Sequence, residues 1–181
     1  MIRKFLSVGE EPWVSPETRN WLDFYLKKNM IVFEYGSGGS TVFFAKRVKK
    51  IISVEYQRFW FVSVVLALLC RGKTNFFLHL YPPERDKKID RLYMSNDPNI
   101  NMFSYKKFVQ SIDSYPNHFF DLVFVDGRAR NQCIKHSLPK VKNNGYLLLD
   151  DSERTIYNPG EKLLAKFKKT VLNTVTVWKI T

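Results

Sequence analysis

The chain has 181 residues (21.4 kDa), of which 45% are hydrophobic and 15% aromatic. That is enough apolar material for one sizeable core, so we expect a single domain over residues 1–181. The longest apolar run, at 59–70, is shorter than the ~20 residues of a membrane span and is expected to form a buried helix. The first residues lack the apolar core of a secretory signal, and Cys70 and Cys133 suggest neither a disulfide framework nor a zinc site, so we expect a cytoplasmic protein.

The formal net charge is +12. A field of this sign attracts phosphates, anionic glycans or acidic membrane surfaces, and it does not choose among them. The basic residues are spread between the structured segments, which favours a generally basic, solvated surface. Nucleic-acid binding driven by counterion release stays open as the alternative.

Helices and strands are expected to alternate along the first half of the chain. Ser15 is a plausible N-cap, and Pro16 suits the first position of the helix that follows. His79 lies inside an apolar strand and is expected in the core. The expected elements are a helix at 16–28, a strand at 30–35, a helix at 41–48, a strand at 51–55, a helix at 59–71 and a strand at 75–81.

The second half begins with a polar connection at 84–101, long enough to lie over a site. Alternating apolar residues at the end of the chain predict a hairpin that turns near Asn173. The elements expected between them are a helix at 104–113, a strand at 119–126, a helix at 131–141, a strand at 145–150 and a helix at 158–169. This alternation predicts an α/β fold that is doubly wound, with a mostly parallel sheet, helices on both faces and an antiparallel hairpin at one edge.

Carboxylates mark the ends of four expected strands. Glu34 lies near the end of the first, Glu55 ends the second, Asp126 the fourth, and Asp150 with Asp151 the fifth. The carboxyl ends of parallel strands border the ligand crevice of an open α/β sheet, where the strand order reverses. A shared site at this edge is therefore favoured over chance.

A glycine cluster follows the first strand, in the stretch EYGSGGST at 34–41. Glycine allows close approach of a ligand to the backbone, and the next helix presents unpaired N–H groups. Glu55 is placed to accept hydrogen bonds from ribose hydroxyls. Thr41 stands where a dinucleotide fingerprint has its third glycine, and Glu34 would repel a pyrophosphate. A nucleoside ligand that carries positive charge suits this pair of acids better.

These stretches resemble the class I S-adenosylmethionine-dependent methyltransferases. EYGSGG is similar to the first motif of that family, ISVE to the second, DLVFVDGRAR to the fourth-strand motif and NNGYLLLDD to the turn and fifth strand. The resemblance implies a Rossmann-like, seven-stranded sheet and an S-adenosylmethionine cofactor. Ser40 departs from the family, whose glycine run often continues at that position.

The resemblance also implies residue roles. The backbone of Gly36 to Gly38 and Glu34 would hold the methionine end, Glu55 the ribose, and Tyr56 would flank adenine. Two alternatives remain: Glu34 capping the amides that start the helix, and Tyr56 in simple packing. The implied cofactor-binding residues are Glu34, Gly36, Ser37, Gly38, Ser40, Thr41, Glu55, Tyr56 and Asp126.

The acids after the fourth and fifth strands suggest two chemistries. Asp126, Asp150 and Asp151 resemble the magnesium ligands of metal-dependent O-methyltransferases, and three oxygen ligands with waters would satisfy Mg²⁺. The metal-free alternative is favoured: Asp126 caps the next helix, and Asp150 orients the acceptor or takes its proton. Arg128 and Arg130 could bind an anionic acceptor, pair with Asp150 or Asp151, or lie on the surface. Asp126, Asp150 and Arg128 are the candidate catalytic residues.

We therefore expect an O-methyltransferase for a small molecule or glycan. Methylation of RNA or another nucleic acid is the alternative that the charge favours, and a non-catalytic binding module on the same fold is a third. The helix at 16–28 and the connection at 84–101 are the expected substrate-side elements.

Overall fold

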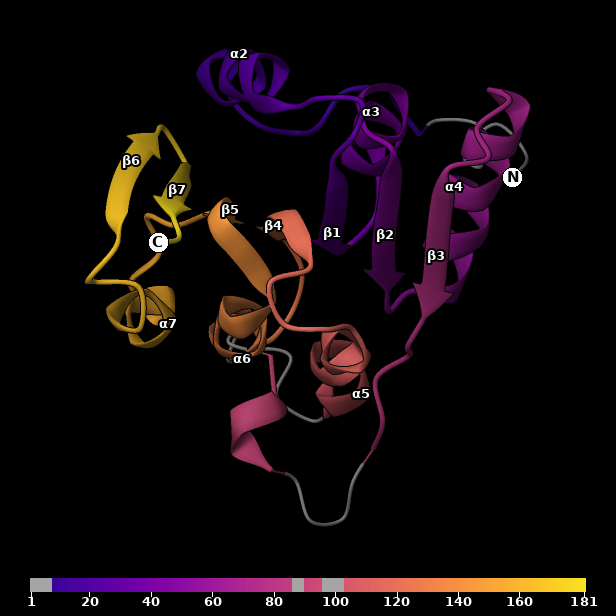
Figure 1. Cartoon of the computed structure of the whole chain (residues 1–181). Helices are drawn as coiled ribbons and strands as arrows, with labels where there is room; N and C mark the ends of the chain where they lie inside the picture. Colours follow the sequence, from indigo (N-terminus) through magenta and orange to yellow (C-terminus); the bar gives the residue numbers. More distant parts are fainter. Residues whose placement is uncertain (1–7, 86–89, 96–102) are drawn as a thin grey trace.

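A computed structural model describes residues 8–85, 90–95 and 103–181. Its centre is a seven-stranded sheet in the order β3-β2-β1-β4-β5-β7-β6 (Figure 1). The first five strands in that order run parallel to one another. Strand β7 runs antiparallel to both of its neighbours, β5 and β6. The strands are β1 (Ile31–Tyr35), β2 (Lys50–Glu55), β3 (Phe76–Leu80), β4 (Phe120–Val125), β5 (Val141–Leu149), β6 (Lys168–Leu172) and β7 (Val175–Lys179).

Helices cover both faces of the sheet (Figure 1). On one face α2 (Pro16–Tyr25), α3 (Gly39–Arg47) and α4 (Arg58–Cys70) pack through Leu22, Phe44 and Leu68 among others. The other face is covered by α5 (Lys106–Gln110), α6 (Arg130–Ser137) and α7 (Asn158–Lys162). Short 3-10 turns at Arg91–Tyr93, Ser111–Ser114, Leu138–Lys140 and Thr155–Tyr157 complete the described elements. The doubly wound α/β fold expected from the sequence is confirmed.

The strand order places the site. The chain passes from β1 outward to β2 and β3, and then returns to β4 on the other side of β1. The order therefore reverses between β1 and β4, which pair in parallel with Tyr35 opposite Val125. Loops leaving the carboxyl ends of these two strands diverge, and this is the position at which open α/β sheets bind ligands.

Several expected boundaries differ from the structure; the helices expected at 104–113 and 131–141, for example, span Lys106–Gln110 and Arg130–Ser137. The helix expected to reach residue 28 ends at Tyr25, because Leu26 adopts an extended backbone and is buried in the core. The fifth strand begins at Val141 rather than after a turn, and absorbs Asn144, at φ 67°, in a register shift against β4. The helix expected to reach residue 169 ends at Lys162, and the segment that follows turns so that Leu164 is buried.

Two expectations about burial are wrong. His79 is exposed, because β3 is an edge strand whose alternate side chains face outward. The run at 59–70 is expected to form a buried helix, yet α4 buries only one side, and Phe59 is 80% exposed. Within the described part of the chain, no helix is both long enough and apolar enough to cross a bilayer. The middle of the expected connection, at 86–89 and 96–101, lies outside the described residues.

Candidate functional site

The loop between β1 and α3 is shaped by two close backbone contacts. Gly36 has φ +87°, and a Cβ there would lie 1.9 Å from the carbonyl oxygen of Asp126. A Cβ on Gly39 would lie 2.2 Å from the carbonyl oxygen of Glu11. The loop is therefore held between the end of β4 and the segment before α2, and neither glycine can be replaced without moving backbone.

Glu34 lies beneath this loop and is fully buried. Its Oε2 accepts hydrogen bonds from Thr41 Oγ1 (2.7 Å) and Ser53 Oγ (2.6 Å), and Thr41 Oγ1 also accepts one from the Gly38 amide (2.9 Å). Burial raises the pKa of Glu34 to about 7, and the surrounding hydroxyls oppose the rise. The Glu34 carboxyl group is thus connected to the start of α3 through the Thr41 hydroxyl. The sequence alternative, in which Glu34 caps backbone amides directly, is not the arrangement described by these hydrogen bonds.

Glu55, at the end of β2, collects four donors. Its Oε1 accepts from the amides of Tyr56 and Gln57, both at 2.8 Å, and its Oε2 accepts from Ser37 N (3.0 Å) and Ser37 Oγ (2.8 Å). Burial raises its pKa, and these hydrogen bonds oppose the rise. The carboxylate therefore joins the glycine loop to the end of β2, and Ser37 Oγ is the one side-chain partner that can rotate away.

A cleft runs along this loop. It contains two adjoining cavities of about 250 Å³ each, which share Trp13, Ser37, Trp60 and Asp126 in their walls. The first is completed by Gly9, Gly38, Gly39 and Ser40, and the second by Gly36, Glu55, Tyr56, Gln57 and Gly127. The predicted residues from the glycine loop, β2 and β4 are thus brought together around one space, while Glu34 and Thr41 support it from below.

Two tryptophans of the cleft, Trp13 and Trp60, were not predicted from the sequence as site residues. Trp60, at the start of α4, donates its indole N–H to the carbonyl oxygen of Ser37. Trp13 is 96% exposed although it borders both cavities. Its backbone is anchored nearby, because Glu10 pairs with Lys46 and Arg71 and the latter also bonds the Val8 carbonyl. An isolated aromatic in a polar segment was the available signal, and nothing local tied it to the glycine loop.

Arg128 approaches the aromatic side of the cleft. Its guanidinium lies 5.6 Å from the centre of the Tyr56 ring, and Tyr56 packs edge-on against Tyr105 at 5.5 Å. Burial raises the pKa of both tyrosines, and the charge of Arg128 opposes the rise. The Nε of Arg128 is buried without a hydrogen-bond partner among the described residues. Arg128 is therefore held beside Tyr56 with one donor unused.

Arg130 joins the ends of β4 and β5. Its side chain is 7% exposed, and one guanidinium nitrogen lies 2.9 Å from Asp126 Oδ1 and 3.1 Å from Asp151 Oδ2. A second nitrogen donates to the carbonyl oxygen of Asp150. Arg154 also pairs with Asp151 at 3.1 Å. Of the three possibilities that the sequence leaves open for Arg130, the internal ion pair is the one that forms.

Asp150 keeps its side chain apart from these pairs. Burial, followed by the charge of Asp126, raises its pKa to about 7, while the charge of Arg130 opposes the rise. Among the residues that the structure describes, no three His, Cys, Asp or Glu side chains gather closely enough to hold a metal ion. The magnesium set of Asp126, Asp150 and Asp151 considered from the sequence is therefore not assembled, and Arg130 bridges two of its members.

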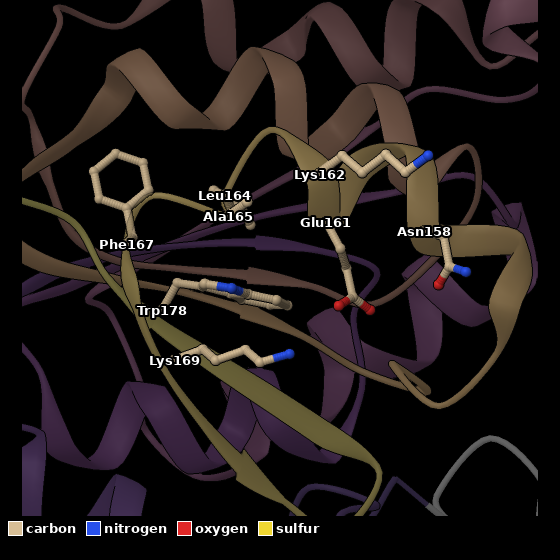
Figure 2. Close-up of a pocket in the computed structure, with 8 residues that line it drawn as sticks. All are labelled: Asn158, Glu161, Lys162, Leu164, Ala165, Phe167, Lys169 and Trp178. Carbon is tan, nitrogen blue, oxygen red and sulfur yellow. The ribbon is translucent and has the colours of Figure 1, made fainter.

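A second cavity, of about 380 Å³, lies away from the predicted residues, between α7 and the hairpin of β6 and β7. Figure 2 shows the Glu161 carboxylate and the Lys169 ammonium turned toward the same space beside the ring of Trp178. Partial burial raises the pKa of Glu161, and the charge of Lys169 opposes the rise. This cavity contains none of the site residues that the sequence predicted.

No protein-family model and no curated protein sequence matches the chain. Solved structures do match. A methyltransferase-like protein from Silicibacter pomeroyi superposes with a TM-score of 0.70 at 21% identity, over 96% of this chain and 90% of its own. SMU.1697c from Streptococcus mutans, solved in complex with S-adenosylhomocysteine, gives 0.64 at 15%, over 93% and 99%. An rRNA methylase from Streptococcus thermophilus gives 0.63 at 14%, over 94% and 99%. The chain therefore has the Rossmann-like fold of the class I S-adenosylmethionine-dependent methyltransferases.

Proposed function

We propose that the protein is an S-adenosylmethionine-dependent methyltransferase that methylates a hydroxyl group of a small molecule or glycan. The observation that carries the proposal is the cleft at the switch point of the sheet. It combines a glycine loop that approaches the ligand with its backbone and a buried carboxylate, Glu55, whose Oε2 already accepts a hydroxyl. Both are features that a nucleoside ligand requires.

The residues present fit this cofactor. A ribose hydroxyl can replace Ser37 Oγ at Glu55 Oε2, while the amides of Tyr56 and Gln57 keep Oε1 in place. Tyr56 is available to flank the adenine ring, and the loop from Gly36 to Ser40 would hold the methionine end. We assign Glu34 an indirect role, because its hydrogen bonds to Thr41 and Ser53 hold the loop from beneath.

When bound, the cofactor supplies a methyl group for in-line transfer, so the protein acts mainly by holding the acceptor in line. Asp126 borders both cavities and lies where an acceptor would meet the cofactor. Asp150, at the end of β5, lines neither cavity; burial and the charge of nearby Asp126 raise its pKa, and we assign it the proton of an acceptor hydroxyl. Arg128 lines neither cavity, and its guanidinium, beside the Tyr56 ring, is the proposed source of positive charge near an anionic acceptor. A group able to accept a proton is useful for a hydroxyl acceptor, which favours O-methylation.

We place the acceptor against Trp13. An almost fully exposed indole at the mouth of a cleft offers a flat face for stacking, and both sugar rings and planar rings stack on tryptophan. In the structure α2 packs on a face of the sheet, so the segment just before it, at 9–13, lines the cleft. This segment and the connection after β3 are therefore the proposed substrate-side elements.

Isothermal titration with S-adenosylmethionine tests the cofactor assignment. We expect wild type to bind, Glu55→Ala to lose binding, and Ser37→Ala to keep it, since the carboxylate then remains open to ribose. Glu161→Ala is the matched control, because it removes a partly buried carboxylate from the other cavity. No binding by wild type, or full binding by Glu55→Ala, would refute the assignment.

Methylation of a nucleic acid is the second candidate, and the charge of +12 is the observation that favours it. Binding of RNA should then weaken steeply with salt, and RNA should accept a methyl group from radiolabelled cofactor. Transfer to glycans or small hydroxyl compounds without transfer to RNA supports the first candidate. Cofactor binding without transfer to any acceptor in a broad panel would indicate a binding module.

A further inference from the structure

Helix α4 has two apolar faces. Its inner face packs on the sheet through Ser63, Val64, Ala67 and Leu68, as a crossover helix should. Its outer face carries four further apolar side chains, which we call the outer stripe: Phe59, Val62, Leu66 and Leu69, exposed by 80, 47, 43 and 57%. Between Arg58 and Arg71 the helix contains no charged residue. Its outer surface therefore lacks the polar face typical of a surface helix.

The spacing of the outer stripe is specific. Its members are separated by three, four and three residues, which is the a/d spacing of a heptad seam. Such a stripe is narrower than the broad apolar face of a helix that lies in a membrane surface. It matches the width of one partner helix, into whose grooves its side chains would insert as knobs. The occupant that this geometry fits is another α-helix.

We infer that two copies of this chain associate through the outer stripe, with α4 packed against α4 about a two-fold axis. The same uncharged seam on both partners is self-complementary, so a contact between copies brings no like charges together at its centre despite the net charge of +12. An anionic partner would find no cation within the stripe. Helix α4 lies beside β3, the edge strand of the sheet (Figure 1).

The exposed area of the outer stripe is small for a dimer interface and fits only a weak, reversible contact. The outer stripe exposes on the order of 350 Å² of apolar side chain, a little under half of the ~800 Å² that each partner buries in a standard interface. Residues beside the seam would supply the rest. The helix is already ordered by its inner face, so association costs little conformational entropy. An interface at this low end of the size range is expected to be weak and transient.

Salt dependence separates this contact from one driven by charge. Two chains of +12 repel each other, and salt screens that repulsion without weakening an apolar seam. Association of the full chain should therefore strengthen when NaCl is raised from about 0.05 to 0.5 M. Chains bridged by nucleic acid or bound to an anionic lipid would dissociate over the same range.

Sedimentation equilibrium of the full chain tests the inference. We expect a monomer–dimer equilibrium in wild type, and a dissociation constant raised by about a hundredfold in Leu66→Glu, which places a charge in the seam. Val171→Glu is the matched control: Val171 is 60% exposed on β6, at the opposite edge of the sheet, and this variant should dimerise like wild type. Unfolding curves of all three show that the variants are folded.

Several results would overturn the inference. A wild type that stays monomeric up to about 100 μM overturns it. This holds whichever other occupant covers the outer stripe: residues 1–7 of the same chain, another protein or an anionic vesicle. A dimer that survives in Leu66→Glu uses another surface. A dimer that dissociates with added salt is held by charge. None of these results depends on methyl transfer, so the proposed function stands or falls separately.

Discussion

Glu34→Gln should separate the stability of this protein from its function. Glu34 is fully buried, and its pKa in the folded chain is about 7, against an ordinary value of 4.5. Between these two pH values the folded chain holds a proton that the unfolded chain has lost. The free energy of unfolding therefore falls as pH rises through this window, and above pH 7 the loss is complete.

The size of the effect follows from the shift. A difference of roughly 2.5 pKa units corresponds to about 3 kcal/mol. Glutamine carries no charge, and its carbonyl oxygen can still accept the hydroxyls of Thr41 and Ser53. We expect Glu34→Gln to lie within about 1 kcal/mol of wild type near pH 5 and to be more stable by about 2–3 kcal/mol near pH 8. If the carboxylate also attracts a positively charged ligand, the same variant binds S-adenosylmethionine less tightly.

Urea unfolding of wild type and variant at several pH values measures this difference. Subtracting the two curves cancels the contribution of other groups, including Asp150. Glu10→Gln is the control, because Lys46 and Arg71 lower the pKa of Glu10 to about 2, so its stabilisation is lost only in acid and the difference should stay flat from pH 5 to 8. A difference for Glu34→Gln that is constant with pH, or that favours wild type more as pH rises, would refute the reasoning.

Three further substitutions probe the loop, the ion pairs and the mouth of the cleft. Gly36→Ala should lower the free energy of unfolding by more than about 3 kcal/mol and abolish cofactor binding, because the added Cβ would collide with the backbone of Asp126. Its control is Gly72→Ala, at φ +63° with open space around it, which should lower the free energy of unfolding by about 1 kcal/mol. Arg130→Gln should cost about 1.5–3 kcal/mol, because Asp126 loses its ion-pair partner and Asp151 keeps only Arg154. Arg154→Gln, at a more exposed site, should cost under about 1 kcal/mol. Urea unfolding measures each variant against its control. Equal losses of unfolding free energy in Gly36→Ala and Gly72→Ala, or in Arg130→Gln and Arg154→Gln, would contradict the structure. Trp13→Ala should change stability by less than about 0.5 kcal/mol and raise the KM for the acceptor, and an unchanged KM would remove Trp13 from the acceptor wall.

The order of helices and strands could be read from the sequence because it depends on short-range periodicity. The glycines after β1 and the acids at the ends of β1, β2, β4 and β5 stand at fixed offsets from their own strands, and a parallel sheet brings such ends to one edge whatever the details of packing. The fold and the meeting of Gly36, Glu55 and Asp126 at one cleft were therefore predictable.

The exposure of α4 and His79 was not predictable in this way. An apolar run has the same composition whether it is covered on one side or on both, and burial depends on which strand ends at the edge of the sheet. Because β3 is that edge, α4 packs on the sheet and on α3 but keeps one side exposed, and alternate residues of β3 face outward.

The partners of the charged groups were decided by tertiary structure. Ser53 contacts Glu34 across neighbouring strands. Trp13 lines the cleft although α2 and β1 separate it from the glycine loop in the sequence. Arg130 pairs with Asp126 and Asp151 because its guanidinium is buried between the ends of β4 and β5. An unpaired charge at that position would destabilise the folded chain. Local pattern placed the acids at the site, and packing determined which of them are tied up in ion pairs and which remain available to a ligand.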